Sequence, residues 1–184
     1  MKDEIKSLKR AIDDGIEGKS VWVPIGFSKM GESVGIGQRI YTIIGGMSGT
    51  GKTAFTDLAY VLQPYSWMKG NGEENNIQVR WLYFSMERSK VYKLAKWASI
   101  RLYTKYNILI DVPTLLGWGN RKNHISSELY EKISETYNVL DEMLDYVEIM
   151  DGGINPTGMY KAVNKYALAH GNIIENSYMT KHVS

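Results

Sequence analysis

The pattern of apolar and polar residues predicts a separate helix at the start of the chain. Between residues 3 and 17 apolar side chains recur at helical spacing on one stripe: Ile5, Leu8, Ile12 and Ile16. Acidic residues occupy the first turn and glycines follow the last, as is typical of helix ends. The stripe has to be covered, either by the helix's own domain or by a second subunit.

Beyond this helix, apolar runs typical of strands alternate with segments of helical period. The predicted strands are 40–45 (IYTIIG), 79–84 (VRWLYF) and 146–150 (YVEIM), with a short apolar piece at 108–112. The predicted helices are 52–62, 88–105, 126–144 and 156–170, and Pro64 is expected to end the first of them. A polar surface loop is expected over 64–78. This alternation predicts an α/β fold with a parallel sheet flanked by helices.

Length and composition fit a globular domain of the cell interior. The 184 residues suffice for one domain with a proper core. Cysteine is absent, which excludes disulfides and thiolate metal sites and is typical of a reducing, cytoplasmic setting. No apolar run approaches the length of a membrane span, and the N-terminus lacks the apolar block of a signal peptide. We therefore expect a cytoplasmic protein with no membrane partner.

Charge is distributed unevenly along the second half of the chain. Residues 88–122 carry eight basic side chains and one acid, whereas residues 123–151 carry eight acids and one lysine. A basic helix beside an acidic one is compatible with a nucleic-acid face next to a subunit contact, or with two solvated helices that partly neutralise each other. The charges alone do not assign a function.

The strongest chemical signal is a glycine-rich loop between the first predicted strand and its helix. Residues 46–53 match G-x-x-x-x-G-K-[ST] in full: Gly46, Met47, Ser48, Gly49, Thr50, Gly51, Lys52 and Thr53. Glycines let successive backbone N–H groups turn toward phosphate oxygens, and the helix N-terminus adds positive potential. Lys52 can reach the β- and γ-phosphates, and the Thr53 hydroxyl can bind Mg²⁺. The loop predicts binding of a nucleoside triphosphate.

Hydrolysis requires more than a phosphate loop. A carboxylate has to orient or deprotonate the attacking water, and Glu87 is the candidate because it follows a predicted strand, at the edge where parallel sheets bind ligands. The alternative is that Glu87 only caps or precedes the basic helix that follows.

The string YFSMERSK around Glu87 resembles the F-S-L-E-M-S segment of DnaB-type hexameric replicative DNA helicases. The order of a VPIGF segment at 23–27, a strand, the phosphate loop and a G-K-T-A-F helix is also similar to their RecA-like motor domain. VPTLLGWG at 112–119 and YVEIMDGG are similar in position, and the resemblance covers about residues 20–170.

The resemblance implies a RecA-like P-loop fold and ATP-driven translocation on single-stranded DNA. It implies that Glu87 is the catalytic carboxylate, that Lys52 acts with it on the phosphates, and that Thr53 holds Mg²⁺ with ATP. Residues 1–19 would be a linker helix that docks on a neighbouring subunit of a hexameric ring, and residues 20–184 the ATP-binding domain. The expected setting is the cytoplasm of a bacterial or phage-infected cell.

The chain departs from the family in several places. Met47 stands where many of these helicases have arginine, and no helical N-terminal domain precedes the motor, as in a phage-like or reduced version. The family's Mg²⁺-shell aspartate, arginine finger and DNA-gripping loops lie beyond the last predicted helix, so the motor is expected to be incomplete here. In the family's order neither Asp111 nor Asp151 is that aspartate.

Two other functions stay open. One is a RecA-like ATP-binding regulatory or helicase-loader module without processive activity, and the other, with no acceptor-binding constellation to support it, is a small-molecule kinase. Among other residues, the three histidines have no metal-ligand spacing. Four tryptophans could stack on bases, although aromatic residues scattered over strands and helices more often pack inside: Trp67, Trp81, Trp97 and Trp118.

Overall fold

A computed structural model describes residues 2–17, 22–37, 40–75, 77–118, 125–170, 173–175 and 181–183. The chain divides into two compact units, residues 1–79 and 80–184. The phosphate loop belongs to the first unit and Glu87 to the second. The expected boundary between residues 19 and 20 lies outside the described residues.

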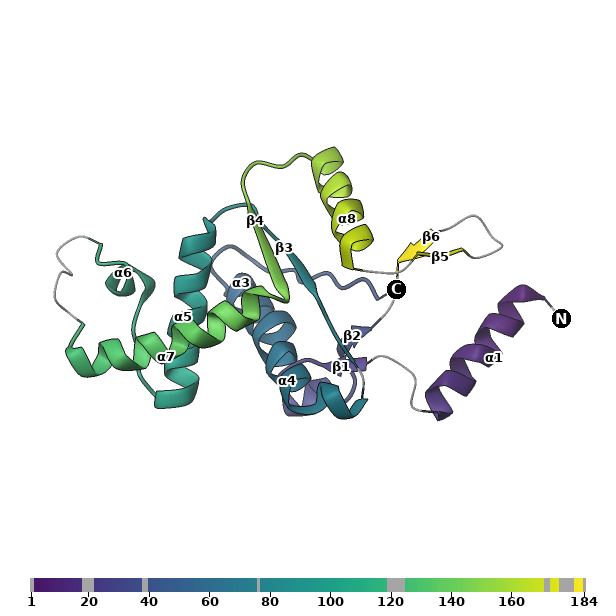
Figure 1. Cartoon of the computed structure of the whole chain (residues 1–184), viewed down its shortest axis with the longest axis horizontal. Coiled ribbons are helices and arrows are strands. Elements are labelled where there is room, and N and C mark those ends of the chain that lie inside the picture. The colour runs from purple at the N-terminus through teal and green to yellow at the C-terminus, as the bar shows by residue number, and fades with distance from the viewer. Residues whose placement is uncertain are drawn as a thin grey trace. The chain divides into compact units, whose positions relative to one another are not determined.

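The first unit contains short strands and a long helical run (Figure 1). Its elements are α1 (Asp3–Ile16), β1 (Trp22–Pro24), α2 (Ser28–Gly31), β2 (Gly35–Gly37), α3 (Lys52–Asp57), the π-helical segment η1 (Leu58–Leu62) and α4 (Gln63–Asn75). β1 and β2 pair antiparallel, with Val23 opposite Ile36. Val23, Val61 and Tyr65 are buried, so the core of this unit lies between β1 and the helical run. The predicted N-terminal helix is confirmed.

The helix after the phosphate loop is longer than predicted. It passes through Pro64 and ends at Asn75, so the expected loop over 64–78 is wrong for its first twelve residues. Proline has no N–H group to donate to the carbonyl oxygen four residues earlier, and its ring crowds that carbonyl. Just before Pro64 the helix widens, and the Gln63 N–H donates to Leu58 O, five residues back. The wider turn accommodates a proline that is fully buried.

The predicted strand over 40–45 is not formed. The backbone of residues 40–47 has no regular structure, and Tyr41 and Ile43 are exposed. A strand is stabilised by hydrogen bonds to a neighbouring strand, and no strand among the described residues pairs with this segment. An apolar, β-branched sequence is therefore not sufficient here.

The second unit is built around a parallel strand pair. Its elements are β3 (Trp81–Ser85), α5 (Lys90–Tyr106), α6 (Val112–Leu115), α7 (Ser127–Leu144), β4 (Val147–Asp151), α8 (Pro156–His170), β5 (Ile173–Glu175) and β6 (Lys181–Val183). β3 and β4 run side by side in parallel, with Trp81 opposite Val147 and Ser85 opposite Asp151 (Figure 1). The predicted strands at 79–84 and 146–150 and the three predicted helices of this region are confirmed to within two residues. The β5–β6 hairpin was not predicted.

Side-chain caps and apolar contacts fix the helices of this unit. The Ser89 and Ser126 hydroxyls accept hydrogen bonds from N–H groups in the first turns of α5 and α7. Leu102 on α5, Ile110 before α6 and Ile133 on α7 form a buried cluster. The described structure is thus a mixed α/β protein with one parallel strand pair, which confirms the α/β class. None of the described helices is long and apolar enough to cross a membrane.

Candidate nucleotide site

The phosphate loop leads directly into the first turn of α3. Gly49 and Gly51 have φ angles of 78° and 85°, which L side chains rarely adopt. No atom lies within 4 Å of a Cβ built on either glycine, so the backbone conformation, and not lack of space, requires glycine there. Gly46 is different, because a Cβ would lie 2.9 Å from the Thr50 hydroxyl oxygen. The sequence motif therefore corresponds to a real turn.

Lys52 holds this turn together from within. Its ammonium donates to the carbonyl oxygens of Gly46 at 2.8 Å and of Met47 at 2.6 Å. The Thr50 hydroxyl also donates to Met47 O, at 2.8 Å. The Lys52 ammonium thus lies inside the loop, where it donates to two of the loop's own carbonyl oxygens. Phosphate binding requires these two carbonyl contacts to be exchanged for phosphate oxygens.

The remaining loop side chains are open to solvent. The Thr53 hydroxyl is exposed and makes no hydrogen bond among the described residues, so it is available to a cation. The Met47 side chain is 81% exposed. The positive-φ glycines, the inward lysine and the exposed threonine fit a triphosphate with Mg²⁺. The structure brings together all eight predicted loop residues.

Glu87 lies at the tip of the turn between β3 and α5. The Ser85 hydroxyl donates to the carbonyl oxygen of Arg88 at 2.6 Å and closes this turn. Met86 and Glu87 are consequently exposed, and Glu87 makes no hydrogen bond among the described residues. The helix that follows is capped by Ser89, so Glu87 precedes this helix without capping it. The Glu87 carboxylate is left available for chemistry at the carboxyl end of a parallel strand.

The two other acids considered as metal ligands are helix caps. The Asp151 carboxylate at the end of β4 accepts a hydrogen bond from the backbone N–H of Lys90, the first residue of α5. Asp111 accepts from the N–H of Thr114 at 2.9 Å, at the start of α6. Such bonds satisfy N–H groups that a helix leaves without a partner. No group of three or more His, Cys, Asp or Glu in the described part of the chain could hold a metal ion.

The charged helices α5 and α7 are only partly neutralised by each other. An ion pair between Lys105 and Glu135, at 3.0 Å, joins the two helices. Hydrogen bonds from the Tyr106 hydroxyl and the Lys105 ammonium lower the pKa of Glu135. Lys93 is buried and donates to the Tyr83 hydroxyl, at 2.8 Å. Residues 119–124, with two of the eight basic side chains, lie outside the described residues.

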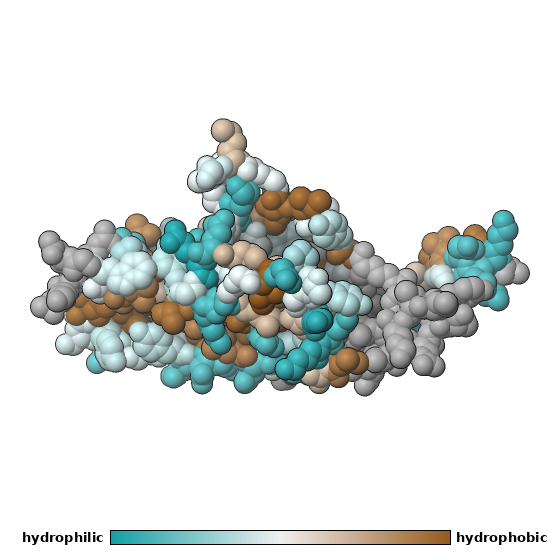
Figure 2. Space-filling model, turned by 90° about the horizontal axis from the view of Figure 1, so that it is seen from above, coloured by the Kyte–Doolittle hydropathy of each residue, from teal (hydrophilic) through white to brown (hydrophobic). Residues whose placement is uncertain are grey.

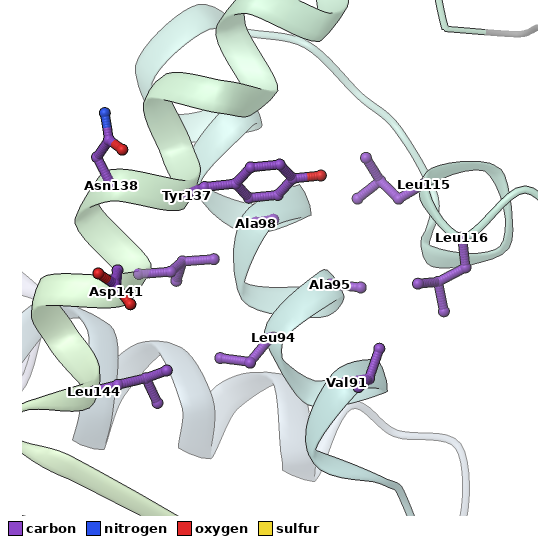
Figure 3. A pocket seen from close by; sticks show the side chains of 11 residues that line it. Val91, Leu94, Ala95, Ala98, Leu115, Leu116, Tyr137, Asn138, Asp141 and Leu144 are labelled. Carbon is purple, nitrogen blue, oxygen red and sulfur yellow. The ribbon is translucent and has the colours of Figure 1, made fainter.

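An apolar groove in the second unit is distinct from all predicted site residues. Its volume is about 460 Å³, and leucine, alanine and valine side chains of α5, α6 and α7 line it (Figure 3). Apolar surface is visible over this part of the molecule in the left half of Figure 2. Asp141 and Asn138 are its main polar members. Because it offers no cationic group to phosphates, this groove does not fit a nucleotide's triphosphate.

Sequence reasoning missed two features of the second unit. The first is the cap that Asp151 provides to a helix 61 residues away, which no local pattern reveals. The second is a contact of Arg88 and Trp118 with Tyr92. The spacing of Arg88 and Tyr92, four positions apart in the predicted helix 88–105, is the only sequence signal that could have pointed to it.

Comparison with known proteins yields no matching family model, no matching curated protein and no matching solved structure.

The cap role of Asp151 can be separated from a metal role. Asp151→Ala is expected to lower the free energy of unfolding by about 1 kcal/mol, because the Lys90 N–H loses its acceptor. Asp151→Asn keeps an acceptor oxygen and is expected to lose less. Asp141→Ala, an exposed acid on α7 and the matched control, is expected to change stability by less than about 0.5 kcal/mol. Urea unfolding and Mg²⁺-dependent ATP binding measure the two roles, and a weakened Mg²⁺ dependence in Asp151→Asn would show that the aspartate is a ligand.

Proposed function

We propose that this chain is the ATP-binding part of a replicative DNA helicase motor of the DnaB-like type. In this proposal the protein hydrolyses ATP to translocate on single-stranded DNA, and its two units belong to a RecA-like domain. The observation that carries the proposal is the complete phosphate-loop motif on a turn that leads into a helix, with Lys52 directed into the loop. The F-S-M-E string of the resemblance ends with Glu87, at an exposed turn after a parallel strand.

The loop residues divide the work of binding among them. Backbone N–H groups around Gly49 and Gly51 and the N-terminus of α3 surround the phosphates. The Lys52 ammonium leaves the carbonyls of Gly46 and Met47 and neutralises charge on the β- and γ-phosphates. The Thr53 hydroxyl would hold Mg²⁺, which supplies further positive charge to the phosphate oxygens.

Glu87 is proposed as the catalytic carboxylate. An exposed carboxylate with no hydrogen bond among the described residues is free to accept a proton from water. Helix capping by Ser89 and Asp151 leaves Glu87 without a structural duty in its own turn. In the proposed reaction it accepts a proton from the water that attacks the γ-phosphate, and the bond between the β–γ bridging oxygen and the γ-phosphorus breaks.

A second function is favoured by one specific observation. Both aspartates at strand or loop ends, Asp111 and Asp151, are occupied as helix caps. Within the described residues, Thr53 is therefore the only proposed protein ligand for Mg²⁺. This favours an ATP-binding regulatory or loader module with slow turnover. The two functions differ in whether DNA stimulates hydrolysis and in whether Glu87 matters.

Oligomer formation is part of the helicase proposal. The apolar stripe of α1 remains exposed, with Ile5 and Ile12 each about half exposed and Leu8 56% exposed, and the helix buries no residue. Exposed apolar stripes of this kind are typical of helices that dock on a partner. We propose that α1 docks on a neighbouring copy in a ring, as the family resemblance implies.

The phosphate-loop role of Lys52 has a direct test. Lys52→Ala is expected to weaken binding of Mg²⁺·ATP by about ten- to a hundredfold, because a charge-assisted hydrogen bond to phosphate is lost. Lys29→Ala, an exposed lysine of α2 in the same unit, is the control and is expected to bind ATP normally. Titration calorimetry measures the affinity. Unchanged affinity in Lys52→Ala would contradict the nucleotide site.

Glu87→Gln separates the two candidate functions. It keeps the shape of the side chain but removes the base, so hydrolysis stimulated by single-stranded DNA is expected to fall about a hundredfold or more, with ATP binding retained. Phosphate release with and without DNA is the measurement. Turnover that is slow, insensitive to DNA and unchanged in Glu87→Gln would reject the motor and support the regulatory module.

The role of α1 in assembly is tested by placing a charge on its apolar stripe. Leu8→Glu is expected to prevent oligomers that form with Mg²⁺·ATP, because a carboxylate would be buried in an apolar contact. Ser7→Glu adds the same charge off the stripe and is expected to assemble normally. Sedimentation velocity distinguishes the species. If the unaltered protein stays monomeric with nucleotide, the ring proposal is wrong for this chain.

A further inference from the structure

Three side chains of the second unit form an exposed stack at the start of α5. The guanidinium carbon of Arg88 lies 4.8 Å from the centre of the Tyr92 ring. The ring centres of Tyr92 and Trp118 are 6.0 Å apart, with their planes inclined by 32°. Half of the Trp118 surface, 51%, remains exposed. The indole is therefore supported by another aromatic ring but presents much of its area to solvent.

Hydrogen bonds of the backbone hold the tryptophan in place. The Trp118 N–H donates to Pro113 O at 2.9 Å, and the Gly117 N–H donates to Thr114 O at 3.1 Å. Gly117 has a φ of 64°, which lets the chain turn back after α6. The turn that carries Trp118 is thus hydrogen-bonded, and its indole contacts the Tyr92 ring while presenting half of its surface to a planar ligand. The other tryptophan of this helical region, Trp97, is fully buried.

Six basic side chains lie on α5 or just before it. Of the six basic side chains in the described residues 88–118, Lys93 bonds to Tyr83 and Lys105 pairs with Glu135. The other four form no ion pair with any described residue: Arg88, Lys90, Lys96 and Arg101. Lys96 follows Tyr92 by one turn of α5, so both lie on one side of the helix, and Arg88, just before the N-cap Ser89, reaches the Tyr92 ring. This surface combines an aromatic platform with unpaired cations.

We infer that the Arg88–Tyr92–Trp118 stack binds single-stranded nucleic acid. One base stacks on Trp118, and the adjacent phosphates lie near Arg88 and Lys96. Stacking on an aromatic ring accepts any base, and cations beside it track the backbone. An acidic peptide would be attracted by the same charge, but its carboxylates do not stack on the indole face as the aromatic ring of a base does. The inference deepens the proposed motor function, on which it rests, by naming the side chains that hold the strand.

The test measures binding of the full chain to a fluorescein-labelled oligothymidylate of about 15 nucleotides by anisotropy, without ATP. Trp118→Leu is expected to weaken binding about tenfold. Tyr130→Leu, which alters a 59% exposed aromatic residue on α7, is the matched control and is expected to bind like the unaltered protein. Trp118→Phe keeps an aromatic face and is expected to retain most of the affinity, which keeps the test valid if the leucine variant unfolds.

A second pair of variants separates the stack from general charge. Arg88→Gln is expected to weaken binding more than Arg101→Gln, although both remove one positive charge from the same region. If oligonucleotide binding is absent, or if Trp118→Leu and Tyr130→Leu bind equally well, the inference is overturned. Equal losses in the two arginine variants, with heparin bound as tightly as the oligonucleotide, would also overturn it, because the surface would then recognise only polyanions.

Failure of this inference is distinguishable from failure of the proposed function. Lys52→Ala is expected to weaken ATP binding but to bind the oligonucleotide normally, because the phosphate loop takes no part in the stack. Normal ATP binding by a protein whose Trp118→Leu variant keeps full oligonucleotide affinity would reject the stack and leave the nucleotide site intact.

Discussion

The parallel pairing of β3 with β4 is the constraint on which the second unit depends. Its register places Ser85 opposite Asp151 at the carboxyl ends of the two strands. From there Asp151 accepts the N–H of Lys90, and the Ser85 hydroxyl closes the turn through Arg88 O. A shift of one residue would reverse the side-chain orientation along the shifted strand and break both contacts. The start of α5, and with it the exposure of Glu87 and the place of Tyr92, follows from this register.

The phosphate loop has a different physical basis. Its shape depends on glycines at positive φ and on a lysine that bonds to the loop's own carbonyls. The Lys52 charge lies against two carbonyl dipoles of the loop. Exchange of carbonyls for phosphate oxygens replaces dipoles with full negative charges, and this difference is a source of binding free energy. The loop leads into α3, and the helical run continues through Pro64 to the end of α4 at Asn75.

Charge in the second unit is ordered more finely than the sequence totals indicate. The basic and acidic helices contact each other, and Lys105 and Glu135 join them as an ion pair. Lys93 is buried, and its ammonium donates a hydrogen bond to the Tyr83 hydroxyl. Of the remaining cations, Lys96 lies on the face of α5 that carries Tyr92 and Arg88 contacts the Tyr92 ring, and the proposed nucleic-acid surface rests on this placement and not on the charge count.

The sequence by itself determined the elements whose signals are local. The amphipathic stripe of α1 and the strands predicted at 79–84 and 146–150 follow from the periodicity of apolar residues. The phosphate loop was also readable, because glycines and lysine at fixed spacing impose their own backbone geometry.

Tertiary structure alone decided the features that depend on distant partners. Residues 40–45 have strand-like composition but pair with no strand among the described residues, and the helix at 52–62 continues through a proline because a π-helical turn accommodates it. Asp151 caps α5 through a contact with Lys90, 61 residues away in the sequence. Trp97 was buried and Trp118 left exposed, although both are tryptophans in helical surroundings. Pairing, burial and long-range hydrogen bonds are properties of neighbours in space, which spacing along one chain does not encode.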